Sequence, residues 1–259
     1  MESNTPTAGG SEFGDVQPHI LCRTGDVAPY VLLPGDPGRA RLIAKQFDTA
    51  RKVAENREYL IFTGYSGGVP MAVCSTGIGS PSAAIGMEEL GKIGCHTFIR
   101  VGSAGGMQLD VGPGDVAIVT AAYRGEGTSK VYLPPEFPAV ANLDVTLALI
   151  EAAKRLGYPV HVGLGSSGDA FYAKKPEGHT EMLHNAGVVA GEMENSALFI
   201  VAAVRHWRAG AIVAIDGSIV RRERKTPGTE HLFHQAVDRE IEIAIEAVKI
   251  LAAHAQKES

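Results

Sequence analysis

Residues 30–39 read Tyr30-Val31-Leu32-Leu33-Pro34-Gly35-Asp36-Pro37-Gly38-Arg39. The four apolar residues predict a buried strand, the Pro-Gly-Asp-Pro segment predicts a tight turn, and the apolar spacing over residues 38–47 predicts a helix. A glycine-rich turn that leaves a strand and opens a helix can direct main-chain N–H groups at an anion, and Arg39 can add a guanidinium. This unit indicates an α/β fold with an anion site at a strand end.

The same alternation of apolar strands and amphipathic helices continues to the C-terminus. Ser80 is expected to cap its helix, and residues 102–106 are expected to form a glycine-rich turn. Strands that are apolar without alternation are covered on both faces, so the sequence predicts an α/β protein, a single three-layer α/β/α domain around a mixed central sheet. Further strands are expected at 59–63, 70–75, 97–101, 115–121, 160–164, 188–190 and 211–215, and helices at 80–91, 143–156, 180–185, 195–207 and 230–253.

Composition narrows the class of protein. The chain has 259 residues, of which 45% are hydrophobic, and its net charge is −5. This is enough apolar sequence for a sizeable core, and the charge argues against a nucleic-acid partner. No apolar stretch approaches the length of a membrane span. The first fifteen residues lack the features of a signal peptide, so we expect a flexible tail over 1–16 and one domain over 17–259.

The cysteines indicate the compartment. Cys22, Cys74 and Cys95 are odd in number, and none lies in a CxxC pair or in a cluster with zinc-type spacing. We therefore expect buried free thiols, a reducing, cytoplasmic compartment and no metal site.

Two further glycine-rich segments follow strands. Arg100 and Ser103 place a guanidinium and a hydroxyl in the first of them, and a buried arginine there needs either a distant carboxylate or an anion as its partner. Residues 75–82 form the second segment, which lacks the third glycine of a dinucleotide fingerprint and contains Pro81. The sequence therefore favours an oxyanion site such as one for phosphate, and argues against a Rossmann dehydrogenase.

Three carboxylates also follow predicted strands. Glu192 and Glu194 come after the strand at 188–190, where a carboxylate either accepts two hydroxyl hydrogen bonds from a vicinal diol such as ribose or interacts with a helix dipole. Asp216 comes directly after the strand at 211–215, where it is either a site residue or the cap of a turn. His19 follows Pro18 after the expected tail, and a lone histidine in such a place is usually incidental.

Taken together, eight separated motifs resemble the nucleoside phosphorylase-I family, which includes purine nucleoside phosphorylases and uridine phosphorylases. The resemblance extends from about Pro18 to the C-terminal helix, and the motifs lie at 18–20, 33–39, 56–59, 75–79, 100–103, 137–140, 167–172 and 192–194. It implies the reversible phosphorolysis of a nucleoside to a free base and ribose-1-phosphate. Inorganic phosphate would be the co-substrate, with no metal and no organic cofactor.

The same resemblance implies a role for each matching residue. His19 and Arg57 would reach into the site of a neighbouring subunit, so we expect a homo-oligomer, a trimer or a hexamer. Asp216, Arg100 and Glu194 would carry the catalysis. Phosphate would be held by Gly35, Arg39, Arg57, Arg100 and Ser103, ribose by His19, Met193 and Glu194, and the base by Phe171, Tyr172, Glu192 and Asp216.

The base stays open between purine and pyrimidine. Lys175 and Glu177 stand where uridine phosphorylases carry a Gln and an Arg that read the uracil edge, and Asp216 matches an Asp that protonates purine N7 in some purine enzymes. Residues 75–80 and 134–138, by contrast, look closest to uridine phosphorylases. We expect a 6-oxopurine nucleoside, with uridine or methylthioadenosine as the alternative.

Two other functions stay open. A nucleosidase, which uses water in place of phosphate, would not need Arg39, Arg57 and Arg100 together. A non-catalytic binding relative would have lost Glu194 or the arginines, and none is lost here.

Overall fold

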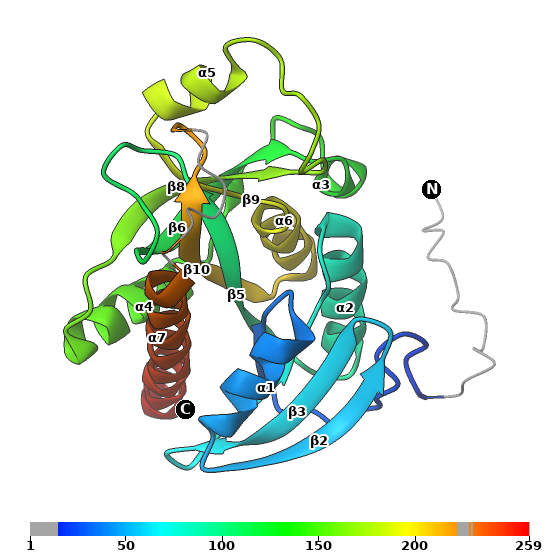
Figure 1. Ribbon diagram of the computed structural model, residues 1–259. Helices are drawn as coiled ribbons and strands as arrows, with labels where there is room; N and C mark the ends of the chain where they lie inside the picture. The colour runs from blue at the N-terminus through cyan, green and yellow to red at the C-terminus, as the bar shows by residue number, and fades with distance from the viewer. Residues whose placement is uncertain (1–14, 222–227, 229, 259) are drawn as a thin grey trace, which may run out of the picture.

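The computed structural model describes residues 15–221, 228 and 230–258. Of the tail expected over residues 1–16, residues 1–14 lie outside this part of the chain. Strands and helices alternate along the sequence, as the apolar pattern predicts (Figure 1). The strands are β1 (Tyr30–Leu33), β2 (Thr49–Asn56), β3 (Tyr59–Ser66), β4 (Val69–Cys74), β5 (Thr97–Gly106), β6 (Val116–Gly125), β7 (Ala139–Val140), β8 (His161–Gly168), β9 (Val188–Glu192) and β10 (Arg208–Ser218). The helices are α1 (Pro37–Lys45), α2 (Ser80–Lys92), α3 (Thr128–Tyr132), α4 (Leu143–Leu156), α5 (His179–Asn185), α6 (Asn195–Arg205) and α7 (Glu230–Glu258).

All the described strands belong to one mixed sheet. Its order is β10-β6-β8-β9-β5-β1-β4-β3-β2, and β10 also pairs with β5, which closes the first five strands of this order into a ring. β5 has parallel neighbours in β1 and β10, whereas β6 runs antiparallel to β10 and β3 antiparallel to both β2 and β4. The prediction of a mixed central sheet in an α/β fold is therefore confirmed.

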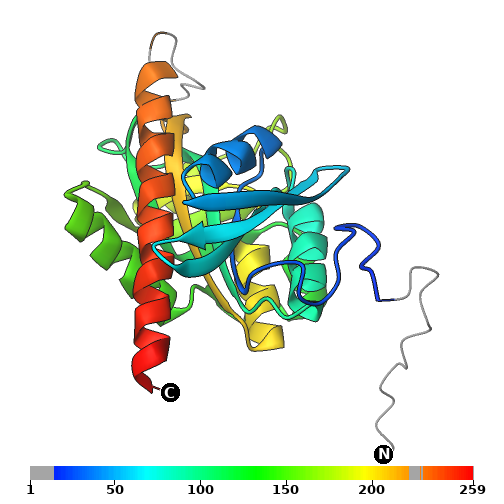
Figure 2. The same ribbon diagram turned by 90° about the horizontal axis from the view of Figure 1, so that it is seen from below.

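Helices cover both faces of this sheet (Figures 1 and 2). One buried cluster joins α2 and α6 to one face, and a second joins α1, α4 and α7 to the other. α7 lies along β10 and also packs against α4. Since the strands are apolar on both faces, each face is stabilised by burial of apolar area, at roughly 25 cal/mol per Å².

The capping groups set where the helices begin. Asp36 accepts hydrogen bonds from the N–H groups of Gly38 and Arg39, so these two amides at the start of α1 are already satisfied. The prediction that Ser80 caps α2 is wrong. Gly79 occupies the N-cap position without a side-chain bond, and the Ser80 hydroxyl instead donates to the carbonyl of Met193, 2.7 Å away.

The glycine-rich segment at 102–106 is not a turn. β5 continues through it to Gly106, because the missing side chains let neighbouring segments approach closely. A Cβ on Gly106 would lie 2.2 Å from the carbonyl oxygen of Val111, and one on Gly105 would lie 2.6 Å from Ile219. β9 pairs with this end of β5, which brings Ala190 and Gly191 beside it.

Two further sequence-based expectations concern the cysteines and the membrane-spanning segments. Cys22, Cys74 and Cys95 are free and buried, as predicted. Within 15–221 and 230–258, none of the helices combines the length and the apolar content that crossing a bilayer requires.

Candidate active site

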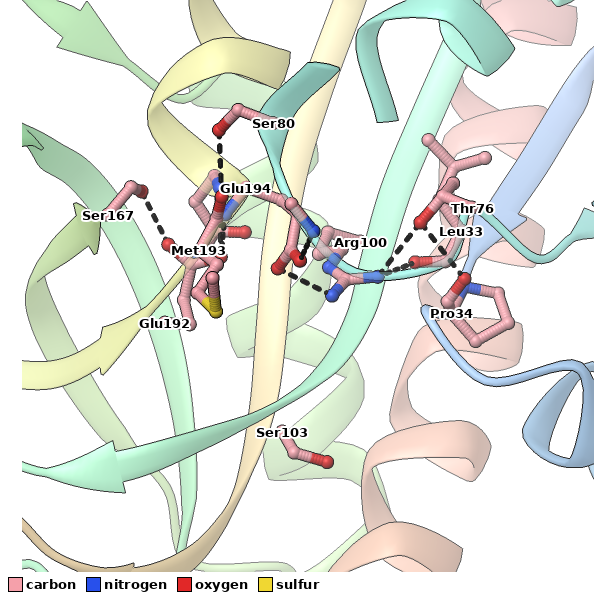
Figure 3. Close-up of polar contacts among 12 residues, drawn as sticks. Leu33, Pro34, Thr76, Ser80, Arg100, Ser103, Ser167, Glu192, Met193 and Glu194 are labelled. Carbon is pink, nitrogen blue, oxygen red and sulfur yellow. Dashed lines mark hydrogen bonds and ion pairs between the residues drawn. The ribbon is translucent and has the colours of Figure 1, made fainter. Parts of the chain in front are cut away.

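A buried ion pair lies at the centre of the predicted site. Arg100 of β5 donates from Nη2 to Oε2 of Glu194 over 2.7 Å, and the two residues are 5% and 3% exposed. Figure 3 shows the Arg100 guanidinium between Glu194 on one side and Leu33 and Thr76 on the other. The carbonyl oxygen of Leu33 and the hydroxyl oxygen of Thr76 lie 3.1 Å and 3.4 Å from Nη1. The N–H of Gly79 donates to the other Glu194 oxygen over 2.6 Å. The distant carboxylate that the sequence left open as a partner for Arg100 is therefore Glu194.

Arg39 forms a second buried cluster. Its Nη2 donates to the hydroxyl of Ser103 over 2.8 Å, and its Nη1 lies 3.4 Å from the carbonyl oxygen of Val101. Nη1 also forms an ion pair with Oε1 of Glu240 at 2.9 Å, and the ring of Phe233 lies 5.9 Å from the guanidinium carbon. The structure thus brings Arg39 and Ser103 together, as the sequence predicts.

β5 joins the two clusters, because it carries both Arg100 and Ser103. The guanidinium of Arg100 folds over Gly102, where a Cβ would lie 3.1 Å from Nε, and it lies beside Gly35, where a Cβ would lie 3.3 Å from Nη2. Nε of Arg100 is buried and has no hydrogen-bond partner among the described residues. Arg100 therefore keeps one charged donor without a partner in the described chain, and the two glycines let its guanidinium lie close against the main chain.

Glu192 and Met193 lie beside this centre. Glu192 accepts N–H bonds from Glu194 and Asn195, and its other oxygen accepts from the hydroxyl of Ser167. Burial, followed by repulsion from Glu194, raises the pKa of Glu192 to about 7. Its carboxylate is thus engaged with the start of α6, and the predicted contact with a base stays a prediction. Met193 is fixed through its carbonyl by Ser80.

Asp216 lies at a bulge in β10. The register with β5 shifts between Ile215 and Gly217, so Asp216 is the extra residue opposite the Ala104–Gly105 step. β-Bulges re-aim a side chain and are frequent next to active sites. β10 runs on to Ser218, so Asp216 is not the cap of a turn after the strand.

The aromatic pair lies at the surface after β8. Phe171 and Tyr172 are 56% and 87% exposed, and their rings meet edge to face with centroids 5.0 Å apart. Lys175 and Glu177 are exposed in the same segment. Phe171 and Tyr172, which are predicted to bind the base, therefore form an exposed aromatic rim that a ligand or a neighbouring chain could cover.

His19 and Arg57 have surroundings of their own. Nδ1 of His19 is 2.5 Å from Oε1 of Glu89, whose carboxylate also accepts the N–H groups of His19 and Ile20. Arg57 is exposed, and its φ of 52° is in the left-handed region. In the described part of the chain, no hydrogen bond or ion pair connects either residue to Arg39, Arg100 or Glu194. This separation is compatible with the role in a neighbouring site that the resemblance implies.

Three residues of these clusters were not found by sequence reasoning. Glu240 and Phe233 of α7 hold Arg39, and Glu89 of α2 holds His19. Glu240 falls within the apolar register of α7, three residues after Val237 and one before Ile241, and an acidic residue in an apolar stripe is a usable signal.

This arrangement has a definite binding chemistry. Two guanidinium groups and a hydroxyl beside a glycine turn can hold a tetrahedral dianion, and a buried carboxylate at 2.7 Å from one of them can accept hydrogen bonds from a diol. Among the described residues, no group of three or more His, Cys, Asp and Glu side chains is placed to bind a metal ion.

Comparison with known proteins agrees with this chemistry. Residues 29–255 match the family model described as the Phosphorylase superfamily. A uridine phosphorylase of Thermococcus kodakarensis is 46% identical over 92% of this chain and 87% of its own, and a guanosine phosphorylase of Halorubrum lacusprofundi is 41% identical over 91% and 99%. The crystal structure of purine nucleoside phosphorylase from Toxoplasma gondii in complex with immucillin-H matches with a TM-score of 0.87 at 32% identity, over 93% of this chain and 98% of its own.

Proposed function

Because the chain belongs to the phosphorylase superfamily and is a nucleoside phosphorylase, we propose that its substrate is uridine, which it cleaves with inorganic phosphate to uracil and ribose-1-phosphate. The observation that carries the phosphorolysis is the arrangement of Arg39, Arg100 and Ser103 around one stretch of β5 next to Glu194. Most of the similar curated relatives are named uridine phosphorylases, including the one that is 46% identical, and these names support uridine as the substrate.

A 6-oxopurine nucleoside, which the sequence favours, is the second candidate. It is supported by Asp216 at the bulge of β10, by the guanosine phosphorylase relative and by the fold match to a purine enzyme. Asp216 would donate a proton or a hydrogen bond to N7 of a purine as it leaves. For uracil, the exposed ammonium of Lys175 would supply a donor in the segment where uridine phosphorylases carry an amide.

The proposed mechanism assigns the buried clusters to the two halves of the reaction. Phosphate would bind to Arg39, Ser103, the main chain at Gly35 and the Nε of Arg100, which has no other partner in the described chain. Glu194 would accept hydrogen bonds from the 2′- and 3′-hydroxyls of the ribose. Bond cleavage builds positive charge on the sugar ring, and the phosphate dianion both stabilises that charge and attacks C1′.

The proposed assembly is a homo-oligomer in which a neighbouring subunit completes each site. The support is that, within the described chain, no hydrogen bond or ion pair connects His19 or Arg57 to Arg39 or Arg100, and that the aromatic rim at Phe171 is exposed. A trimer or a hexamer would satisfy this requirement. We also propose that residues 17–259 form one domain and that the enzyme is cytoplasmic, which the buried free thiols support.

One set of assays tests these assignments. The rates of base release from uridine, inosine, guanosine and methylthioadenosine are measured with and without phosphate. We expect turnover that requires phosphate, with the highest kcat/KM for uridine. A higher kcat/KM for inosine or guanosine would replace uridine with the purine candidate, and equal turnover without phosphate would identify a nucleosidase.

A further inference from the structure

Glu240 is a buried carboxylate to which the proposed reaction gives no role. It lies in the middle of α7 and is 0% exposed, and Oε1 forms the 2.9 Å ion pair with Nη1 of Arg39. Outside that ion pair, neither carboxylate oxygen has a well-formed hydrogen bond within the described chain. A carboxylate that is buried with a single partner is costly to keep ionised, so its protonation state responds to any charge that enters nearby.

The surroundings of Glu240 contain few other charges. Arg39 of α1 and Arg100 of β5 act on it, and the main chain of Ala214 on β10 contributes a weaker polar interaction. The other elements packed against α7, namely α4, β4 and β6, supply apolar side chains to the same buried cluster. Phe233, seven residues before Glu240 on the same helix, also contacts Arg39. α7 therefore presents two groups to one arginine.

The charges of the two buried ion pairs balance before an anion binds, and the buried Glu192, whose pKa burial raises to about 7, adds a further negative charge when it is ionised. Arg39 and Arg100 carry two positive charges, and Glu194 and Glu240 carry two negative charges when both are ionised. A phosphate dianion would leave these two ion pairs with two excess negative charges. One proton on Glu240 would remove one of these negative charges. It would also end the ion pair with Arg39, so that the charge of Arg39 is balanced by the anion.

We propose that Glu240 is a positioning residue for Arg39 that takes up one proton from solvent when a phosphate dianion binds. This inference rests on the proposed function, because it requires that Arg39 binds phosphate. The proton adds to one carboxylate oxygen, and the resulting neutral carboxyl group still contacts Arg39 through its carbonyl oxygen. Glu240 touches neither phosphate nor nucleoside, and it acts through Arg39.

The titration range of Glu240 suits this coupling. Burial raises the pKa of Glu240 to about 8, against the opposing effect of Arg39 and Arg100. A bound dianion raises this pKa further, so affinity for the dianion is greatest below pH 8 and falls as the pH rises through it. By linkage, a group with a pKa of about 8 that stays protonated in the complex weakens binding about tenfold between pH 7 and pH 9.

Sulfate is the probe for this test, because it remains a dianion across the whole range whereas phosphate itself titrates near pH 7. Sulfate affinity is measured between pH 6.5 and pH 9 for the wild type, Glu240→Gln and Glu240→Ala. The amide of Gln keeps an acceptor for Arg39 without the charge. We expect Glu240→Gln to bind sulfate as the wild type does at pH 6.5 and about tenfold more tightly than the wild type at pH 9. Glu240→Ala, which lacks the acceptor, is expected to bind more weakly at every pH.

Calorimetry on the wild type gives a second measurement that needs no variant. Sulfate binding in buffers of different ionisation enthalpy reports the protons taken up, and we expect close to one per sulfate at pH 9 and close to none at pH 6.5. Glu242→Gln is the matched control, since Glu242 lies on the same helix but accepts from the hydroxyl of Tyr158. It is expected to retain the pH dependence of the wild type.

The outcomes separate this inference from the proposed function. If sulfate binds, and Arg39→Ala weakens it, but the wild type and Glu240→Gln lose affinity equally with pH, the coupling is refuted and phosphate binding at Arg39 stands. If Arg39→Ala binds sulfate and phosphate as the wild type does, the assignment of Arg39 to phosphate is itself wrong.

Discussion

Replacing Glu194 by Gln tests the centre of the site most directly. Glu194 is 3% exposed, and its two oxygens accept from Arg100 at 2.7 Å and from the N–H of Gly79 at 2.6 Å. Gln has nearly the same shape but no charge, so the substitution removes the charge-assisted acceptor that the proposed mechanism gives to each ribose hydroxyl. Such bonds contribute about 1.5–3 kcal/mol each. For two hydroxyls, kcat/KM is expected to fall by about 10²–10⁴-fold.

A second substrate separates the contributions of the two ribose hydroxyls to this loss of kcat/KM. A 2′-deoxynucleoside lacks one of the two hydroxyls. The fold loss of kcat/KM caused by Glu194→Gln is therefore expected to be about 10- to 150-fold smaller for this substrate than for the ribonucleoside. The assay compares the wild type and the variant on both substrates at saturating phosphate. Equal losses on the two substrates would refute the contact between Glu194 and the 2′-hydroxyl.

The same variant has a structural cost that must be measured separately. It leaves the buried Arg100 without its ion-pair partner, and breaking such a pair costs about 3–5 kcal/mol of stability. The melting temperature is therefore recorded in parallel, and the assays are run well below it. Since both substrates are assayed on the same folded variant, the ratio of the two losses is independent of the fraction that folds.

Four further predictions can be tested. Ser103→Ala removes the hydroxyl that faces Arg39, and is expected to raise the KM for phosphate about 2- to 13-fold with a smaller change in the KM for nucleoside. Asp216→Asn is expected to lower purine phosphorolysis more than uridine phosphorolysis, and equal effects would remove its role at N7. Inactive Arg57→Ala and inactive Arg100→Ala chains, refolded together, are expected to recover about a quarter of wild-type activity if sites are shared between subunits, and none if they are not. Because burial raises the pKa of Glu240 to about 8, the wild type is expected to lose stability relative to Glu240→Gln as the pH rises from about 4.5 to 8, measured by chemical unfolding.

Local patterns were enough to predict most of the fold. The apolar run at 30–33 and the helical spacing after it give β1 and α1, and Gly157 ends α4 in the left-handed conformation that its position suggested. β2 was missed because residues 49–56 are mostly polar and exposed, so this edge strand has no apolar alternation to detect. The glycines at 102–106 were misassigned because only tertiary packing shows that they admit neighbouring segments instead of forming a turn.

The site was predictable in its members but not in its pairings. Arg39 and Ser103 were both identified, yet their contact spans 64 positions, and Arg100 and Glu194 are 94 apart. Glu240 could have been noticed as an acidic residue in an apolar stripe. Nothing in the sequence connects it to Arg39, because that contact depends on how α7 crosses the sheet.

β5 presents its polar side chains to both faces of the sheet. Arg100 shares a face with Phe98 and the α2–α6 layer, whereas Ser103 shares the opposite face with Val101 and the α1–α7 layer. Neither half of the molecule therefore holds the whole of the proposed anion receptor. A designer who wished to transplant this receptor into another scaffold would have to move the strand together with helices from both sides, and an enzyme split between the two layers would regain its receptor only on reassembly.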